Sequence, residues 1–184
     1  MKIVLIGIQG SGKSTQGELL QNKLHVPFLA TGQIFRTLAK EETSEIGKYI
    51  REYMFAGHLV PDEKVIEIVS GYLSKEEYKN GYILDGFPRT VKQAESFSED
   101  LDLVVYLKVS DEEALNRIAG RKDTTRKDER PEAINQRIKA FHEQTEPVIE
   151  YYRTRGKLIE VNGEQSIEEI HEKIKVLVQK YAKP

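Results

Sequence analysis

Five short runs of apolar and β-branched residues recur along the chain, at residues 2–6, 26–30, 82–85, 103–107 and 157–161. Within each run apolar residues mostly follow one another instead of alternating with polar ones. That pattern is typical of strands buried on both faces of a parallel sheet. Because segments with helical spacing separate the runs, the pattern predicts an α/β fold around a parallel sheet.

Two of the intervening segments are clear amphipathic helices. Residues mostly apolar recur at steps of three and four at Ile134, Ile138, Phe141, Thr145, Val148 and Tyr152, and again at Ile167, Ile170, Ile174, Leu177 and Tyr181. Residues 31–60 interrupt the simple alternation, and they predict two helices inserted between the second strand and a helix that begins near Asp62. Residues 121–130, RKDTTRKDER, hold no apolar residue, so composition alone predicts a solvated loop.

Length and charge limit the classes of function. A chain of 184 residues with 39% hydrophobic residues is enough for one core domain, residues 1–184. Lysine and arginine total 28 against 30 acidic residues, so no global field attracts a polyanion and nucleic acid is not an expected partner. With no cysteine and four widely separated histidines, we expect no structural zinc.

The distribution of apolar residues also bears on membranes. Residues 3–8, IVLIGI, form too short an apolar run for a signal-peptide core, and no stretch approaches the ~20 residues needed to cross a bilayer. We therefore expect a soluble, cytoplasmic protein with no membrane partner, and a monomer.

The strongest motif is the stretch GIQGSGKS at residues 7–14. Its spacing is G-x-x-x-x-G-K-S, directly after a predicted strand and before a helix that carries Leu19, Leu20 and Leu24. Glycines in this context let backbone N–H groups converge on phosphate oxygens at the positive end of a helix. A tight turn alone would not need Lys13. The motif predicts a nucleoside triphosphate site formed by Gly10, Ser11, Gly12, Lys13, Ser14 and Thr15.

Two positions of this predicted site have distinct chemical roles. The Lys13 ammonium offsets charge on the β and γ phosphates, and the Ser14 hydroxyl is a candidate ligand of Mg²⁺. A carboxylate is also needed near the metal, and Asp85 ends the third apolar run, YILD. Taken alone, Asp85-Gly86 is also a common turn dipeptide. Beside the glycine loop we interpret Asp85, with Ser14, as part of the Mg²⁺ site.

Several further stretches carry a resemblance to a known family. These are ATGQIFR at residues 30–36, GHLVPDE at 57–63, ILDGFPRTVKQAE at 83–95, TTRKDERPEAINQRI at 124–138 and QTEPVIEYYRTRGKLIEVNG at 144–163. In order and nearly from end to end, the chain resembles the adenylate kinase family of nucleoside monophosphate kinases. The resemblance implies a P-loop NTPase fold with a five-stranded parallel sheet flanked by helices. It also implies a helical monophosphate-binding insertion at residues 31–60, a short lid at 121–131, and reversible Mg²⁺-dependent transfer from ATP to AMP giving two ADP.

The resemblance also assigns roles to individual residues. Arg117, Arg121 and Gln165 would join the glycine loop in binding ATP. Residues that would bind AMP are Thr31, Arg36, His58, Leu59, Val60, Gly86, Phe87, Pro88, Arg89, Gln93, Arg126 and Arg137. The charges expected to act on the migrating phosphoryl group are those of Lys13, Arg89, Arg121, Arg126 and Arg137. Because an acceptor phosphate is largely dianionic at neutral pH, with a second pKa of ~6, we expect no general base.

Four residues depart from the family pattern. Gln9 and Ser14 stand where the family usually has proline and glycine, Gln33 stands where an aspartate is usual, and Glu129 replaces the second of two aspartates. We expect the last departure to alter how the lid closes. None of them removes a group expected to contact the transferred phosphoryl, so we expect activity.

Three other functions fit parts of the sequence. A UMP/CMP kinase would carry a similar arginine set, but those relatives tend to have a smaller residue than Thr31 and an asparagine at the position of Gln93. A non-catalytic module that senses ATP and AMP would not need the complete arginine set. A shikimate- or gluconate-type P-loop kinase would leave the stretch ILDGFPRTVKQAE unexplained.

Overall fold

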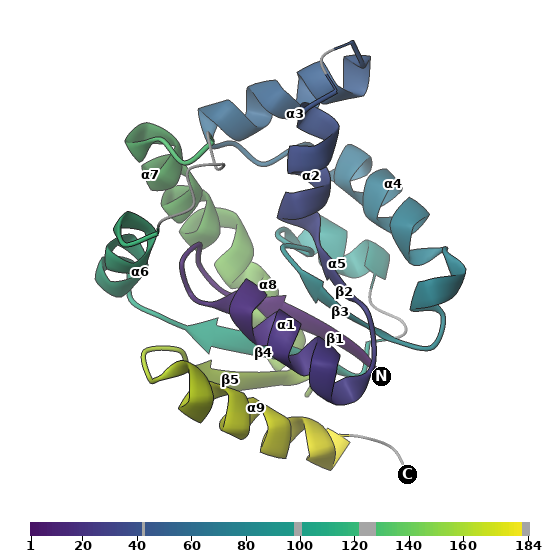
Figure 1. Ribbon diagram of the computed structural model, residues 1–184, viewed down its shortest axis with the longest axis vertical. Helices are drawn as coiled ribbons and strands as arrows, with labels where there is room; N and C mark the ends of the chain where they lie inside the picture. Colours follow the sequence, from purple (N-terminus) through teal and green to yellow (C-terminus); the bar gives the residue numbers. More distant parts are fainter. Residues whose placement is uncertain (42, 98–100, 122–127, 182–184) are drawn as a thin grey trace.

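A computed structural model describes residues 1–41, 43–97, 101–121 and 128–181. Five parallel strands form one sheet in the order β2-β3-β1-β4-β5 (Figure 1). The strands are β1 (Lys2–Ile6), β2 (Phe28–Ala30), β3 (Tyr82–Asp85), β4 (Leu103–Lys108) and β5 (Leu158–Asn162). All five predicted strands and the predicted α/β class are confirmed.

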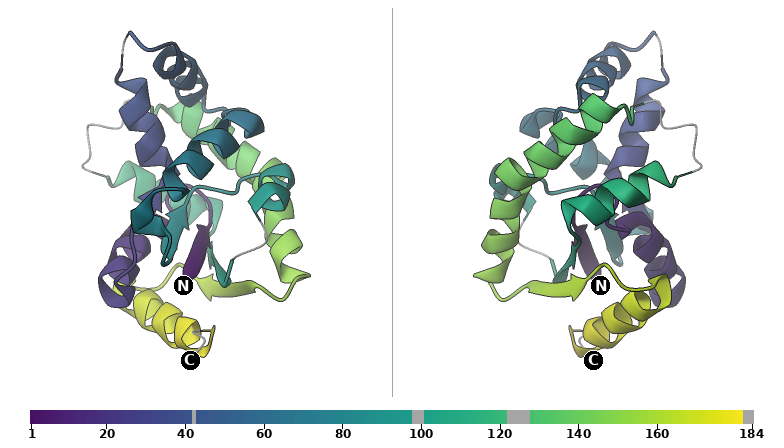
Figure 2. Two further views of the ribbon diagram at one scale, coloured as in Figure 1. Left: turned by 90° about the vertical axis from the view of Figure 1, so that its right-hand side faces the viewer. Right: turned by 90° about the vertical axis from the view of Figure 1, so that its left-hand side faces the viewer.

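Helices cover both faces of the sheet (Figures 1 and 2). Ile3 and Leu5 pack on one side with residues of α1 (Lys13–Leu24) and α9 (Ile167–Tyr181). Val4 and Ile6 face the other side, where α4 (Asp62–Leu73), α5 (Val91–Phe97) and α8 (Glu146–Arg153) contribute to the core. Burial on both faces explains the continuous apolar runs, because every side chain of a central strand then lies in the core.

The predicted insertion is present between β2 and α4. It consists of α2 (Thr31–Ala39) and α3 (Glu45–Ala56), which pack on each other at the far end of the molecule from α9 (Figures 1 and 2). Ser44 caps α3 by accepting a hydrogen bond from Gly47 N at 3.3 Å. Outside the insertion, a 3₁₀ turn at Glu76–Tyr78 lies between α4 and β3, and α6 (Asp111–Ala119) follows β4.

The predicted helix over residues 134–152 has a feature that its spacing did not reveal. It comprises α7 (Pro131–Ala140), a π-helical turn at Phe141–Thr145, and α8. Pro147 lies in the first turn of α8 and has no N–H to continue the α-helical hydrogen-bond pattern. The chain therefore widens into a π turn there, and such turns occur frequently at functional sites.

No helix within the described ranges has the length and apolar character needed to cross a membrane.

Candidate active site

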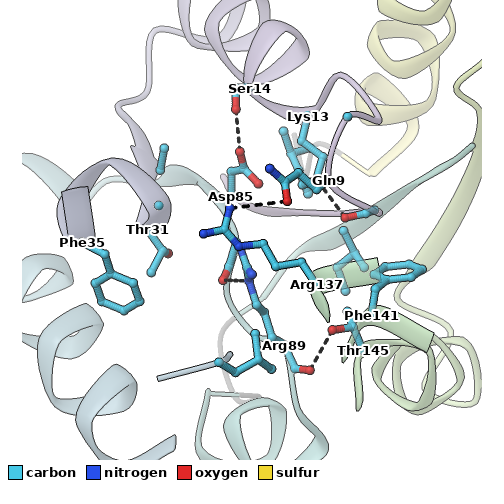
Figure 3. Close-up of a pocket in the computed structure, with 18 of the residues that line it drawn as sticks. Gln9, Lys13, Ser14, Thr31, Phe35, Asp85, Arg89, Arg137, Phe141 and Thr145 are labelled. Atoms are coloured by element: carbon cyan, nitrogen blue, oxygen red, sulfur yellow. Dashed lines mark hydrogen bonds between the residues drawn. The ribbon is translucent and has the colours of Figure 1, made fainter. Parts of the chain in front are cut away.

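The candidate site is a cavity at the carboxyl edge of the sheet (Figure 3). Because the strands are parallel, the loop after β1, the start of α2 after β2, and Asp85 at the end of β3 all meet at this edge. The cavity has a volume of about 280 Å³, near the lower end of the range for ligand pockets. Residues from α3, α7 and the π turn form its opposite wall.

Most residues expected from the sequence to bind nucleotide line this cavity. They are Gly10, Gly12, Lys13, Ser14, Thr15, Thr31, Arg36, His58, Leu59, Val60, Asp85, Gly86, Pro88, Arg89, Gln93, Arg121 and Arg137. Residues as far apart in the sequence as Gly10 and Arg137 therefore line one cavity.

Five of the expected residues are not among its lining residues. Ser11 is 1% exposed, and Phe87 packs edge-on against Phe97 in the core. The Arg117 guanidinium donates from Nε to Glu113 Oε1 at 2.6 Å, and Gln165 accepts from Lys173 on the surface. Arg126 lies outside the described residues, with most of the predicted lid, so its role stays a prediction.

Two glycines of the loop have a left-handed backbone conformation. Gly10 and Gly12 have φ values of 91° and 89°, a region that residues with a side chain rarely adopt. Lys13 Nζ donates to Gly7 O at 2.8 Å and to Ile8 O at 2.9 Å. Burial lowers the pKa of Lys13 to about 8, and the nearby Arg89 and Arg121 act in the same direction against the opposing charge of Asp85.

Ser14 and Asp85 meet at the start of α1, as the sequence interpretation required. Ser14 Oγ donates to Asp85 Oδ2 at 2.9 Å, and the carboxylate is only 8% exposed (Figure 3). A hydroxyl and a carboxylate are hard oxygen ligands, and Mg²⁺ commonly binds one or two such groups while keeping several waters. The donor set fits Mg²⁺. No cluster of three His, Asp or Glu side chains suited to a metal occurs among the residues that the structure describes.

The Arg89 guanidinium is anchored to the backbone just beyond the end of β3 (Figure 3). Its Nε donates to Gly86 O at 2.9 Å, and its own carbonyl accepts from Thr145 Oγ1 at 2.9 Å. Burial lowers the pKa of Arg89 from its ordinary value, the neighbouring Arg137 and Arg36 lower it further, and Asp85 opposes the shift. A fixed, concentrated positive charge of this kind suits a phosphate oxygen.

The cavity is also lined by two uncharged polar side chains, those of Gln93 and Thr31. Gln93, 1% exposed, accepts from Arg89 N at 2.7 Å and donates to Asp62 Oδ1 at 2.8 Å. Asp62 also accepts from Thr90 Oγ1 at 3.0 Å, so its carboxylate fixes two side chains. The buried Thr31 Oγ1 has no hydrogen-bond partner within the described part of the chain. A buried hydroxyl of this kind is suited to meet a polar atom of a ligand.

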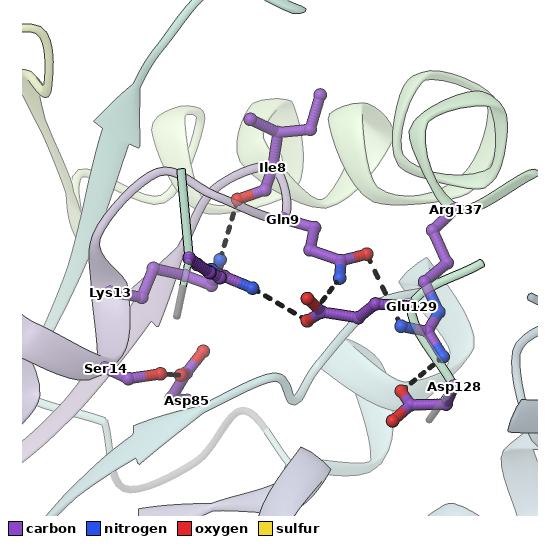
Figure 4. A network of polar contacts seen from close by, with 9 residues as sticks. Ile8, Gln9, Lys13, Ser14, Asp85, Asp128, Glu129 and Arg137 are labelled. Carbon is purple, nitrogen blue, oxygen red and sulfur yellow. Dashed lines mark hydrogen bonds and ion pairs between the residues drawn. The ribbon is translucent and has the colours of Figure 1, made fainter. Parts of the chain in front are cut away.

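Arg121 and Arg137 line the same cavity as the glycine loop and pair with acidic residues. Arg121 Nη1 lies 2.7 Å from Glu129 Oε1, and Arg137 Nη2 lies 2.8 Å from Asp128 Oδ2 (Figure 4). Arg121, Asp128 and Glu129 belong to the charged segment and Arg137 belongs to α7. All four residues line the same cavity as the glycine loop.

Sequence reasoning missed several residues of the site. The cavity is also lined by Gln9, Phe35, Met54, Val65, Asp128, Glu129, Phe141 and Thr145. Gln9 lies within the glycine motif. Like Glu129, it is notable in the sequence only because it departs from the family pattern. The role of Asp62 in holding Gln93 had no local signal, because the two residues are 31 positions apart.

Comparisons with known proteins agree with this geometry. A family model described as adenylate kinase matches residues 5–157. An adenylate kinase from Caldicellulosiruptor bescii is 38% identical over 202 aligned positions, covering 91% of this chain and 94% of the relative. One from Acetivibrio thermocellus is 36% identical, covering 92% and 94%, and one from Methanosarcina barkeri is 35% identical, covering 99% and 100%. The chain belongs to the adenylate kinase family.

Proposed function

We propose that this protein catalyses the reversible, Mg²⁺-dependent transfer of a phosphoryl group from ATP to AMP, giving two ADP. The observation that carries the proposal is one cavity lined by two unlike sets of groups. A glycine loop with Lys13 forms one set, Thr31 and Gln93 form the other, and Arg89 and Arg137 line the same cavity. We assign the first set to one end of the cavity and the second to the other end. Two nucleotides placed with their phosphates toward each other would match this arrangement of charge.

The donor phosphates would rest on residues 10–15. Backbone N–H groups of the loop and the first turn of α1 provide directed donors, and the helix dipole favours negative charge there. The Lys13 ammonium is held by loop carbonyls of the same site, so a small side-chain movement would bring it to the β and γ phosphates. Ser14 and Asp85 would hold Mg²⁺, which when bound neutralises charge on the donor phosphates.

The acceptor would occupy the end bordered by α2, α3 and α4. Thr31 and Gln93 would meet the adenine ring, and Arg36 and Arg89 would bind its phosphate. The Gln93 amide is already oriented by Asp62 and the Arg89 backbone, which fixes the side on which its hydrogen bonds are available. We assign residues 31–60 to the monophosphate-binding subdomain on this basis.

Transfer itself requires the two phosphates in line and the shifting negative charge balanced. Arg89, Arg121 and Arg137 border the same cavity as Lys13, so four positive side chains would surround the migrating group. Arg117 and Gln165 stay predicted members of the donor site. Arg126 stays a predicted member of the AMP site and of the charges around the migrating group, with residues 121–131 as the predicted lid. We also propose that the monomer is active, because this one chain supplies groups suited to both nucleotides.

The base preference distinguishes this function from that of a UMP/CMP kinase. Thr31 and Gln93 support AMP, because an amide pairs with the edge of adenine and a buried hydroxyl adds a second contact. The relatives are themselves named adenylate kinases. A purely sensing module is not favoured, because the residues expected to act on the phosphoryl group in the described ranges converge on the cavity.

The direct test is to supply purified protein with ADP and Mg²⁺ and to follow nucleotides by chromatography. ATP and AMP should appear in equal amounts, and chelation of Mg²⁺ should stop their formation. With ATP as donor, a panel of AMP, UMP, CMP and GMP should give the highest kcat/KM for AMP. Absence of ATP would exclude the kinase function, and a higher kcat/KM for UMP or CMP would exclude the proposed acceptor.

A further inference from the structure

A chain of polar side chains joins the glycine loop to the segment that precedes α7 (Figure 4). Gln9 lies in the loop between Gly7 and Gly10, and its Nε2 donates to Glu129 Oε1 at 3.0 Å. The same carboxylate oxygen accepts from Arg121 Nη1 at 2.7 Å. The Gln9 amide and the Arg121 guanidinium therefore share one acceptor atom.

The oxygen of the Gln9 amide faces a second arginine. Gln9 Oε1 is 3.5 Å from Arg137 Nη1, which is the outer limit of a hydrogen bond. Arg137 is held more closely by two other acceptors, Asp128 Oδ2 at 2.8 Å and Met54 O at 3.0 Å. The contact between Gln9 and Glu129 is therefore the stronger of the two links that this amide makes.

These contacts are largely shielded from water. The side chains of Asp128 and Glu129 are 7% and 9% exposed, and those of Arg137 and Arg121 are 14% and 30% exposed. Ion pairs of low exposure are weakly screened by salt, and loss of one partner leaves the other charge uncompensated. Removing one partner from this network should therefore have a larger effect than removing one partner of a surface pair.

The arginines need such a network because they lie close to other positive charges. Arg121 and Arg137 border the same cavity as Lys13 and Arg89. Their mutual repulsion, and the rotamer entropy of the long arginine side chains, oppose any single shared arrangement. Glu129 supplies counter-charge to Arg121, and Gln9 connects that pair to the loop on which donor phosphates would rest.

We propose that Gln9 is a positioning residue for phosphoryl transfer, acting through Glu129 to set the Arg121 guanidinium relative to the glycine loop. The inference rests on the proposed function and deepens it. A displacement of about 1 Å in a charge that acts on the transition state is enough to lower a rate by ~10²-fold. Gln9 touches neither reacting phosphate in this assignment, so its effect is on geometry and not on charge.

The first test removes the amide without changing charge. Gln9→Leu should lower kcat about tenfold while the KM values for ATP and AMP change less than about threefold, because only the arrangement required in the transition state is disturbed. The matched control is Gln179→Leu, in which an exposed glutamine on α9 away from the cavity is replaced. Circular dichroism and thermal melting should show both variants folded.

The second test exchanges the two groups of the contact. Gln9→Glu places two carboxylates about 3 Å apart, which should lower kcat at least as much as Gln9→Leu. The double variant Gln9→Glu with Glu129→Gln restores one amide and one carboxylate in exchanged positions, at the net charge of the wild type. It should recover at least a third of the wild-type kcat. If Gln9→Leu does not fold, the comparison of Gln9→Glu with the double variant tests the proposal by itself.

The outcomes separate the two proposals. Failure of the wild type to form ATP from ADP would overturn the proposed function and the inference together. With an active wild type, a Gln9→Leu enzyme whose kcat stays within twofold would overturn the inference alone. So would an exchanged double variant no more active than Gln9→Glu, because the effect would then come from charge near the phosphates and not from the contact.

Discussion

The two ends of the cavity are held together by different kinds of contact. At the end proposed to bind the acceptor, the Gln93 side chain accepts from the Arg89 backbone N–H and donates to the Asp62 carboxylate. At the end proposed to bind the donor phosphates, Lys13 donates to backbone carbonyls, and Arg121 pairs with a carboxylate. Each positive group there has an oxygen partner that a phosphate oxygen could replace.

This difference indicates that the two ends have different functions. Groups fixed in advance at the acceptor end favour selection of a base, since their orientation does not depend on the ligand. Charges with exchangeable partners at the phosphate end favour stabilisation of a charge that moves during the reaction. Substitutions at the phosphate end should therefore affect kcat, and substitutions at the acceptor end should affect KM for AMP.

The largest expected effect is that of Lys13→Met at the phosphate end. The substitution keeps an unbranched side chain but removes the ammonium, so kcat should fall by at least about 10²-fold, the usual cost of one preorganised charge-stabilising donor. Steady-state assay in the ADP-forming direction measures it, with circular dichroism as the control for folding. An enzyme with more than a third of the wild-type kcat would show that Lys13 does not stabilise the transition state.

The next effect concerns the acceptor end, through Thr31→Val. This change keeps the shape of the side chain but removes a hydroxyl that is buried without a partner in the described part of the chain. KM for AMP should rise by a factor equivalent to about 1–3 kcal/mol, and KM for ATP should hardly change. The free protein should be as stable as the wild type or slightly more stable in urea unfolding.

The control for this substitution is Thr154→Val, at an exposed position at the end of α8. It should leave both KM values unchanged. Equal increases of KM for ATP and AMP in Thr31→Val would contradict the separation of the two ends.

A pH effect should distinguish the phosphate end further. The pKa of Lys13 is lowered to about 8 from its ordinary 10.5, and phosphate binds the charged form. Triphosphate binding at pH 8 should therefore be accompanied by proton uptake, and affinity should fall by up to about tenfold per pH unit above that value. Calorimetry in two buffers of different ionisation enthalpy measures the uptake.

The same shift predicts the direction of a stability change. Between pH 8 and 10.5 the unfolded chain binds more protons at Lys13 than the folded chain does, so this residue's contribution to the free energy of unfolding rises with pH. Lys13→Arg, whose side chain stays charged in this range, should lose both effects. Proton uptake that persists at pH 8 in that variant would assign it to another group.

The smallest expected effect, a change in stability with pH, concerns a charged cluster that does not line the cavity. His142 contacts Glu146 Oε1 at 2.7 Å and Asp111 at 3.0 Å. The hydrogen bond with Glu146, aided by Asp111, raises the pKa of His142 above 6.5 despite partial burial. Its contribution to stability is complete below pH 6.5 and is lost as the pH rises through the higher folded pKa.

That contribution should be less than about 1 kcal/mol, because the pairs are exposed to solvent. Urea unfolding of the wild type and of His142→Gln at several pH values measures it, and the difference between them should shrink as the pH rises. Activity should not change in the variant. A loss of kcat would show that charges beyond the cavity also act on the reaction.

Local patterns in the sequence were enough to predict much of the fold. The observed strands begin and end within two residues of the five apolar runs, because burial on both faces leaves a signal that needs no knowledge of partners. The glycine loop, α2, α3 and the start of α4 were also predicted, since loop motifs and helical spacing are properties of short segments. Positions of the two nucleotides stay a proposal, as do the roles of individual arginines.

What only the tertiary structure decided depends on residues distant along the chain. Asp85 could be read either as a turn residue or as a metal ligand, and its contact with Ser14, 71 positions away, favours the second interpretation. The contact between Gln9 and Glu129 spans 120 positions, and neither residue alone indicates it. Such pairs form because parallel strands bring their carboxyl ends to one edge of the sheet, so the strand order β2-β3-β1-β4-β5 determines which loops become neighbours. Local spacing carries no record of that order, and the cavity is built from it.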